Sequence, residues 1–162
     1  MAEEPRALEG PEMYRRLRGM ALDAVALGLP APPPEHPGVS GVVVDIPAGG
    51  GAFATLVAMA DGTTSLYSSS GGGTIGAGAH PAVAEATHAL LAVVDRRLEE
   101  FGEDDDTEQP IGARVRFFVL TPEGRRVVDV PDAAFWGHEE HELTPVIAAA
   151  QEVIAALRQV SG

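Results

Sequence analysis

A glycine-rich segment at residues 68–78 has the residue types of a loop that binds an anion. It reads Ser-Ser-Ser-Gly-Gly-Gly-Thr-Ile-Gly-Ala-Gly. Its small side chains leave backbone N–H groups bare, and the start of a following helix adds unpaired N–H groups and a positive dipole end. A phosphate, a sulfate or a carboxylate would suit such donors. The candidate ligand-binding residues are Ser68, Ser70, Gly71, Gly72, Gly73, Thr74 and His80.

The same glycines have a simpler interpretation, which is that they let the chain pass close under a neighbouring element. The string Gly71-Gly-Gly-Thr-Ile-Gly76 matches G-x-G-x-x-G, but that motif joins a strand directly to a helix. Here it follows the polar return arm of a hairpin, and the next helix begins near Pro81. The chain also has no lysine, which excludes a P-loop and Schiff-base chemistry. The sequence therefore favours a tight connection over an anion site.

Two histidines, His138 and His141, lie among three glutamates and are the candidate metal ligands. Their i, i+3 spacing differs from H-E-x-x-H, whose histidines share a helix face. An acidic loop leading into a helix at Thr144 is the favoured interpretation. The acidic run 103–108 lacks the twelve-residue calcium pattern and predicts a solvated loop. We expect no bound metal and no cofactor.

A serine nucleophile would have to come from Ser68, Ser69 or Ser70, with His80 or His88 as base and Asp95 as its partner. The chain has no G-x-S-x-G elbow. His88 and Asp95 are seven residues apart, too far for a direct hydrogen bond along a straight helix. Loop serines more often cap and turn the backbone. The sequence predicts no catalytic residue.

Two apolar groups predict contact with another protein. Met13, Leu17 and Met20 recur at helical spacing in a segment that precedes a proline-rich stretch. Phe135 and Trp136 stand in an irregular segment. Such a pair either fills the core under a loop or, where exposed, marks a binding surface, since tryptophan is enriched at hot spots. The pattern does not decide whether the first helix packs on its own chain or on a second copy.

The elements that must position these residues follow from apolar periodicity and turn signals. Helices are predicted over 11–28, 81–102 and 144–160, and strands over 42–46, 53–60, 63–69, 114–120 and 125–130. Arg114 and Arg116 flank Val115 on one strand and so share a face.

The dipeptide Asp61-Gly62 predicts a two-residue type I′ hairpin turn. Such a turn sets the register, with Val57 opposite Leu66 and Ala54 opposite Ser69. If strand 42–46 pairs with strand 53–60, loops 49–51 and 68–78 converge at the other end of the hairpin. We expect the helix start at His80 to lie there too.

The fold class that follows is α+β, with an antiparallel sheet of about five strands in the order α-β-β-β-α-β-β-α and helices packed on the sheet. Residues 1–29 form an N-terminal helix, 30–38 a proline-rich linker and 39–162 a single α+β domain. The order of elements resembles a cyclic permutation of that in roadblock and longin domains, and a profilin-like architecture is compatible with it. The resemblance carries no motif, so it implies no function.

Composition narrows the function classes. The 162 residues carry a formal net charge of −13, which argues against nucleic acid and an anionic membrane surface as partners. No lysine or asparagine is present, which indicates a GC-rich bacterial genome. The chain also has no cysteine, which fits a cytoplasmic location. The first residues do not form a signal peptide, and no apolar run is long enough to span a bilayer.

The sequence therefore predicts a non-catalytic protein-interaction or dimerisation module whose partner is a second copy of the chain or another protein. The alternative is a domain, or an enzyme, that binds a small anion at the glycine-rich loops 49–51 and 68–78.

Overall fold

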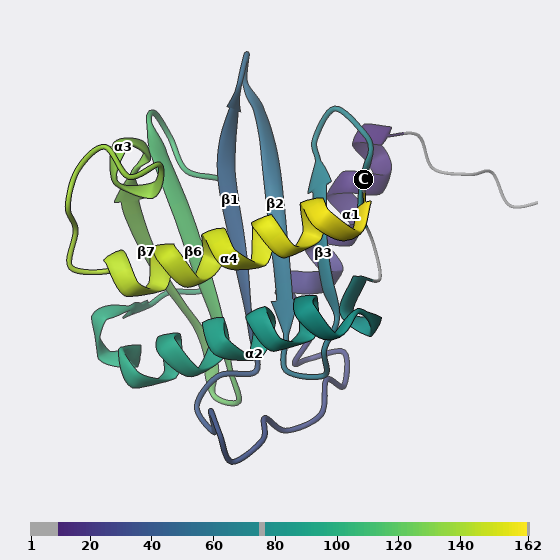
Figure 1. The fold of residues 1–162 in the computed structure, drawn as a ribbon, viewed down its shortest axis with the longest axis vertical. Coiled ribbons are helices and arrows are strands. Elements are labelled where there is room, and N and C mark those ends of the chain that lie inside the picture. The colour runs from purple at the N-terminus through teal and green to yellow at the C-terminus, as the bar shows by residue number, and fades with distance from the viewer. Residues whose placement is uncertain (1–9, 75–76, 162) are drawn as a thin grey trace, which may run out of the picture.

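A single antiparallel sheet organises the protein. The computed structural model describes residues 10–74 and 77–161, so residues 75–76 of the glycine-rich segment lie outside the description. Within those ranges seven strands pair in the order β4-β3-β2-β1-β6-β7-β5 (Figure 1). Their bounds are β1 Gly41–Gly49, β2 Ala52–Met59, β3 Thr64–Ser68, β4 Gly73–Thr74, β5 Gly102–Glu103, β6 Arg114–Thr121 and β7 Gly124–Pro131. The predicted α+β class is confirmed. The five-strand count was too low, because each edge carries a further strand of two residues.

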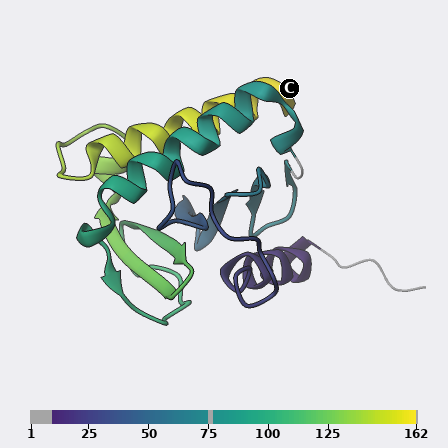
Figure 2. The ribbon, with the colours of Figure 1, turned by 90° about the horizontal axis from the view of Figure 1, so that it is seen from below.

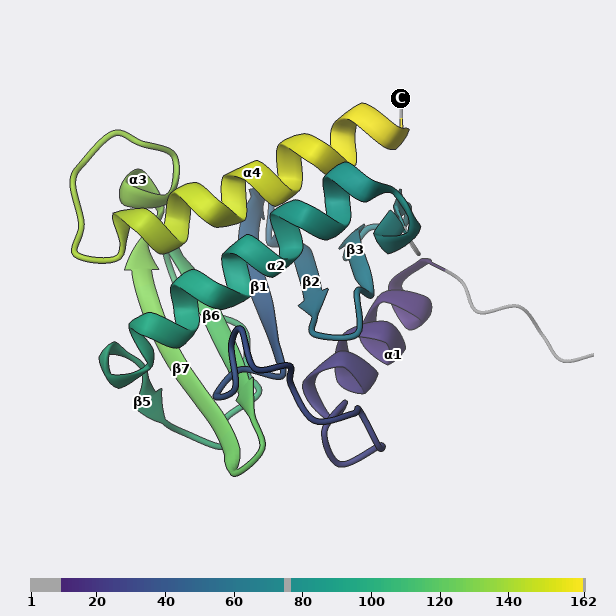
Figure 3. The same ribbon diagram turned by 60° about the horizontal axis from the view of Figure 1, so that its bottom comes forward.

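Helices cover both faces of the sheet. α2 (Pro81–Arg96) and α4 (Thr144–Ser161) lie side by side on one face, while α1 (Gly10–Leu22) lies on the other (Figures 2 and 3). The short α3 (Asp132–Phe135) follows β7, in a segment predicted as irregular. Two 3₁₀ turns, Ala77–Ala79 and Leu98–Glu100, flank α2. Among the described residues no helix is both long and apolar enough to cross a membrane.

The face under α2 and α4 holds the larger apolar cluster. Alternation along β1 sends Val42, Val44 and Ile46 to this side. The helices bury the stripes that their spacing predicts, and each of these residues is at most 1% exposed: Val83, Leu90, Leu91, Val94, Val146, Ala150, Val153 and Leu157. The predicted strand pairing of 42–46 with 53–60 is also confirmed.

The opposite face is covered by α1, which packs on the sheet of its own chain. Tyr14, Ala21 and Leu22 are buried against β1, β2 and β6. The helix ends at Leu22 rather than near Gly28, because the chain turns over residues 23–28. Met13 and Met20, two of the predicted contact residues, lie on the outer side with 37% and 50% of their surface exposed. Leu17 is partly buried against the sheet.

The predicted register of the β2–β3 hairpin was wrong by one residue. Ala54 pairs with Ser68 rather than Ser69, and Leu56 with Leu66. The Met59 N–H donates to the Thr63 carbonyl at 2.8 Å, so the loop between them has three residues, 60–62. Every described residue with a positive φ is a glycine, and in this loop that is Gly62. A type I′ turn needs two such residues, so the chain adds one and ends the turn on glycine.

The proline-rich segment 30–38 carries the chain around the end of the sheet, from α1 to the side of α2 (Figure 2). The Gly38 N–H donates to Asp95 Oδ1 of α2 at 2.8 Å. His36 is 1% exposed. The segment is therefore packed against the domain over its last residues.

Candidate functional site

The glycine-rich loops 49–51 and 68–72 lie together at one end of the sheet. Gly50 and Gly51 form the turn between β1 and β2. Ser69 exchanges two hydrogen bonds with Phe53: its N–H donates to the carbonyl and its hydroxyl accepts the N–H, both at 2.8 Å. The predicted convergence with loop 49–51 is confirmed for residues 68–72 of the glycine-rich segment.

Several of the N–H groups and hydroxyls that could bind an anion already form hydrogen bonds within the 68–73 hairpin. The Ser68 N–H donates to the Gly72 carbonyl and the Gly71 N–H to the Ser68 carbonyl. The Ser68 and Ser70 hydroxyls bond to each other at 2.8 Å. Thr74 of β4 pairs with Leu66 of β3.

Close backbone approach explains Gly73 of this hairpin and Gly10 of α1, which packs against the hairpin. A Cβ on Gly10, at the start of α1, would stand 2.9 Å from the Gly71 Cα, so the helix rests on the loop. A Cβ on Gly73 would stand 2.6 Å from the Tyr67 Cα. These contacts support the simpler interpretation of the glycines.

The helix start at His80 lies at the other end of the β2–β3 hairpin, away from the glycine-rich loops. The chain runs back along β3 before α2 begins, and Gly78 packs directly against the Gly62 carbonyl, where a Cβ would clash. His80 precedes Pro81, the first helical residue, and makes no side-chain cap. The expectation that this helix start joins the glycine-rich loops was wrong, because Gly73 and Thr74 pair with β3 and the chain has reached the Gly62 end of the β2–β3 hairpin by Gly78.

The serine-triad candidates lie apart. His88 Nδ1 is 3.5 Å from His36 Nε2, and Asp95 holds the Gly38 N–H. Both therefore contact the proline-rich segment, while the Ser68 and Ser70 hydroxyls bond to each other and the Ser69 hydroxyl accepts the Phe53 N–H. No arrangement of nucleophile, base and orienting acid results.

The metal candidates lie on the loop before α4. His141 Nδ1 accepts the Leu143 N–H at 3.0 Å, and the Thr144 hydroxyl donates to the His141 carbonyl. His138 is exposed. Within residues 10–74 and 77–161 no group of three or more His, Cys, Asp or Glu side chains is placed to hold a metal ion.

Phe135 is buried in the core, whereas Trp136 beside it is partly exposed. Phe135 is 1% exposed and lies against Phe117, with ring centroids 6.2 Å apart. Trp136 is 43% exposed and meets Phe135 edge to face at 5.1 Å. The indole N–H donates to Asp132 Oδ1 at 3.0 Å, which fixes the ring. Fixing a large aromatic side chain in advance lowers the entropy that a binding partner must overcome.

Trp136 forms one wall of a cleft between the α3–α4 loop and α4. The cleft has a volume of about 580 Å³. Ile147 and Ala148 of α4 and Ala134 and Phe135 of α3 also contribute apolar lining. Glu139 and Glu140 line it from the loop, and both are exposed.

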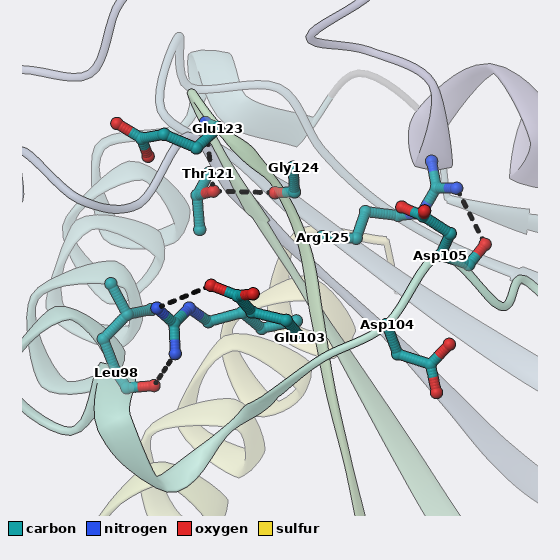
Figure 4. Close-up of a pocket in the computed structure, with 9 residues that line it drawn as sticks. Leu98, Glu103, Asp104, Asp105, Thr121, Glu123, Gly124 and Arg125 are labelled. Carbon is teal, nitrogen blue, oxygen red and sulfur yellow. Dashed lines mark hydrogen bonds and ion pairs between the residues drawn. The ribbon is translucent and has the colours of Figure 1, made fainter.

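A second cavity of about 570 Å³ lies beside the β6–β7 turn (Figure 4). Its walls are mostly charged, with Glu103, Asp104 and Asp105 on one strand-like segment and Arg125 and Arg126 on β7. The two arginines are committed to protein groups. Arg126 donates to the Leu98 and Phe101 carbonyls, and Arg125 to the Leu22 and Asp105 carbonyls.

A buried polar network under α1 escaped the sequence analysis. Asp45 of β1 is 0% exposed, and its Oδ2 lies 2.7 Å from Nη2 of Arg18. The Thr55 hydroxyl donates to Asp45 Oδ1 at 2.7 Å. The Thr55 proton is thereby committed, so Tyr14 donates its hydroxyl proton to Thr55 at 2.6 Å, and Gln109 donates to Tyr14 at 2.7 Å. The chain of donors ends on the carboxylate. A carboxylate between Val44 and Ile46 was the signal that a buried partner had to exist.

Burial raises the pKa of the Tyr14 hydroxyl above its usual value, and the nearby Asp45 carboxylate acts in the same direction. The pKa of Tyr67, whose ring meets Tyr14 edge to face, is raised by burial as well. Both phenols therefore stay protonated at neutral pH, and Tyr14 acts as a hydrogen-bond donor within the protein.

The acidic run 103–108, predicted as a solvated loop, is bound by arginines through backbone carbonyls in and beside it. Arg18 donates to the Thr107 carbonyl, Arg116 to the Glu108 carbonyl and Arg125 to the Asp105 carbonyl. Arg116 also pairs with Asp129 at 2.6 Å, and Arg114 reaches the same carboxylate at 3.9 Å. That shared partner is consistent with the predicted common face of Arg114 and Arg116.

Comparisons with family models, with curated proteins and with solved structures find no match for this chain.

Proposed function

We propose that this protein is a non-catalytic protein-binding module whose docking site is the Trp136 cleft. The partner we infer is a basic segment that carries an apolar side chain. The observation that carries the proposal is Trp136 itself, fixed by Asp132, exposed over 43% of its surface, and forming a wall of a cleft of about 580 Å³. Rigid, partly exposed aromatic residues beside a pocket are typical binding hot spots.

Charge favours a basic partner. Glu139 and Glu140 line the cleft, and the whole chain carries a net charge of −13. Arginine or lysine residues that flank an apolar anchor would approach both carboxylates, and the overall field would speed the encounter. A second copy of the chain would bring the same carboxylates together, so self-association through this cleft is disfavoured.

The anion-binding alternative has less support. The Ser68 and Gly71 N–H groups and the Ser68 and Ser70 hydroxyls bond within the 68–73 hairpin, and Ser69 bonds to Phe53. His80 lies at the other end of the β2–β3 hairpin, where Gly78 meets Gly62.

Two synthetic peptides test the proposal. Both have twelve residues, lack tryptophan and tyrosine, and share one Leu and one Phe; one carries arginine flanks and the other glutamate flanks. Because Trp136 is the single tryptophan, its emission reports on the cleft alone. We expect a saturable emission change with the arginine peptide that weakens as salt is added, and none with the glutamate peptide. Equal responses, or none at millimolar peptide, would overturn the proposal.

Two matched variants locate the binding. Ala148 lines the cleft, while Ala155 lies seven residues further along the same helix and does not line it; both are exposed. Ala148→Arg and Ala155→Arg change the net charge equally. We expect the affinity for the arginine peptide to fall at least about tenfold only in Ala148→Arg. A dimer in sedimentation that Ala148→Arg dissociates would show that a second copy occupies the cleft and would refute a basic partner.

A further inference from the structure

His36, in the proline-rich segment, is held so that one ring nitrogen is fixed as a proton donor. Its backbone N–H donates to the Pro33 carbonyl at 3.1 Å, and its carbonyl accepts the Val39 N–H at 3.2 Å. Its ring Nδ1 lies 3.1 Å from the Val39 carbonyl oxygen. A carbonyl oxygen only accepts hydrogen bonds, so Nδ1 carries the proton of the neutral ring. The lone pair is therefore on Nε2, in a side chain that is 1% exposed.

His88 of α2 brings a second nitrogen to that lone pair. Its Nδ1 lies 3.5 Å from His36 Nε2. The two rings are within 28° of parallel and their centroids are 5.8 Å apart, so they meet at their nitrogen-bearing edges. A separation of 3.5 Å is long for a hydrogen bond between nitrogens. Two nitrogens bound to one tetrahedral metal ion at about 2.0–2.1 Å lie roughly 3.4 Å apart.

We propose that His36 and His88 form a binding site for a divalent transition-metal ion of the zinc, nickel and copper class, which favours imidazole ligands. An ion about 1 Å to the side of the line between the two nitrogens is within bonding distance of both. The hydrogen bond from His36 Nδ1 to a backbone carbonyl is the outer-shell contact that orients most metal-binding histidines. Water completes the coordination. His88 moves its proton to Nε2, so no proton is released.

The site differs from the His138–His141 pair in being preorganised. His141 Nδ1 already accepts a backbone N–H, and His138 stands on an exposed loop. His36 is immobilised by the turn around it, and His88 is exposed on a helix, so an ion reaches the pair from solvent. Metal at this position joins the 30–38 segment to α2, beside the Gly38–Asp95 hydrogen bond.

Calorimetric titration of the full, untagged chain with Zn²⁺ and with Ni²⁺ tests the site. We expect one ion per chain, and at least about tenfold weaker binding for His88→Ala. His80→Ala is the matched control and keeps wild-type affinity, because His80 is an exposed histidine at the start of α2. Zn²⁺ also raises the melting temperature of the wild type but not of His88→Ala.

A long-range ¹H–¹⁵N spectrum distinguishes this site from the other histidine pair. Zn²⁺ should shift His36 Nε2 and His88 Nδ1, and the His138→Ala/His141→Ala variant should show the same shifts and affinity. Unchanged binding in His88→Ala, loss of binding in His138→Ala/His141→Ala, or no binding by the wild type would each overturn the proposal.

Discussion

The face of the sheet under α2 and α4 and the face under α1 are stabilised by different chemistry. On the first face, the fully buried Leu90, Val94 and Val153 of two long helices pack against side chains of β1 and β6. The second has one helix of 13 residues, and at its centre Arg18, Asp45, Thr55 and Tyr14 form a hydrogen-bonded chain. Apolar burial is non-directional, whereas a buried polar network has one satisfactory geometry. We infer that the α2/α4 face supplies most of the stability, and that the α1 face fixes where a single helix sits.

The largest effect should come from the polar face. Asp45→Ala leaves the Arg18 guanidinium and the Thr55 hydroxyl without their shared acceptor, and should cost about 3–5 kcal/mol in urea unfolding. Replacing both charges, in Arg18→Met/Asp45→Leu, removes the unpaired charge and should be more stable than Asp45→Ala. A double variant less stable than the single one would contradict this account.

The same substitution on each face sharpens the comparison. Leu90→Ala, at 0% exposure, should lower the free energy of unfolding by about 2–5 kcal/mol. Leu22→Ala, at 3% exposure in α1, should fall at the low end of that range and should speed amide exchange in α1 more than in α4. Equal acceleration of exchange in both helices would show that the two faces unfold as one unit.

Tyr14→Phe should have a smaller effect, about 1 kcal/mol at neutral pH, because one hydrogen bond in the chain is lost. Its pH dependence carries more information. The pKa of Tyr14 is raised in the folded state, so its contribution is complete below the ordinary tyrosine pKa of about 10 and is lost as pH rises through the raised value. Urea unfolding from pH 8 to pH 11 should therefore show a shallower loss in Tyr14→Phe, with Tyr67 accounting for a remaining slope.

The smallest effect should come from the outer side of α1. Met20→Ala removes a side chain that is 50% exposed and should change stability by less than about 0.5 kcal/mol in thermal unfolding. A loss above about 1.5 kcal/mol, or one that depends on protein concentration, would mean that Met20 is buried in an assembly of two copies.

The same contrast explains how much the sequence could predict. The stripes of α2 and α4 consist of Val, Leu and Ala at helical spacing, so periodicity predicted both helices and their buried sides. The buried side of α1 includes Arg18, which periodicity counts as a surface residue. Asp45 and Arg18 are 27 residues apart, and their pairing depends on the path of the proline-rich segment around the sheet.

The candidate site was predicted in part for a similar reason. The pairing of β1 with β2 brought loops 49–51 and 68–72 together, as local strand signals indicated. The position of His80 was wrong because β4 pairs with β3 and Gly78 packs against Gly62, and local sequence signals do not indicate these contacts. Trp136 was a candidate contact residue on the basis of its residue type, whereas the cleft beside it requires α4 to stand opposite, which only the fold shows.

The two-residue strands at the sheet margins limit how chains of this protein can associate. β4, Gly73–Thr74, pairs with only two residues of β3, and β5, Gly102–Glu103, with only two residues of β7, so neither margin presents one long continuous strand edge. An incoming extended chain would find little to pair with, which is how natural sheets resist fibre growth. This edge geometry favours recognition of a partner through side-chain surfaces over extension of the sheet.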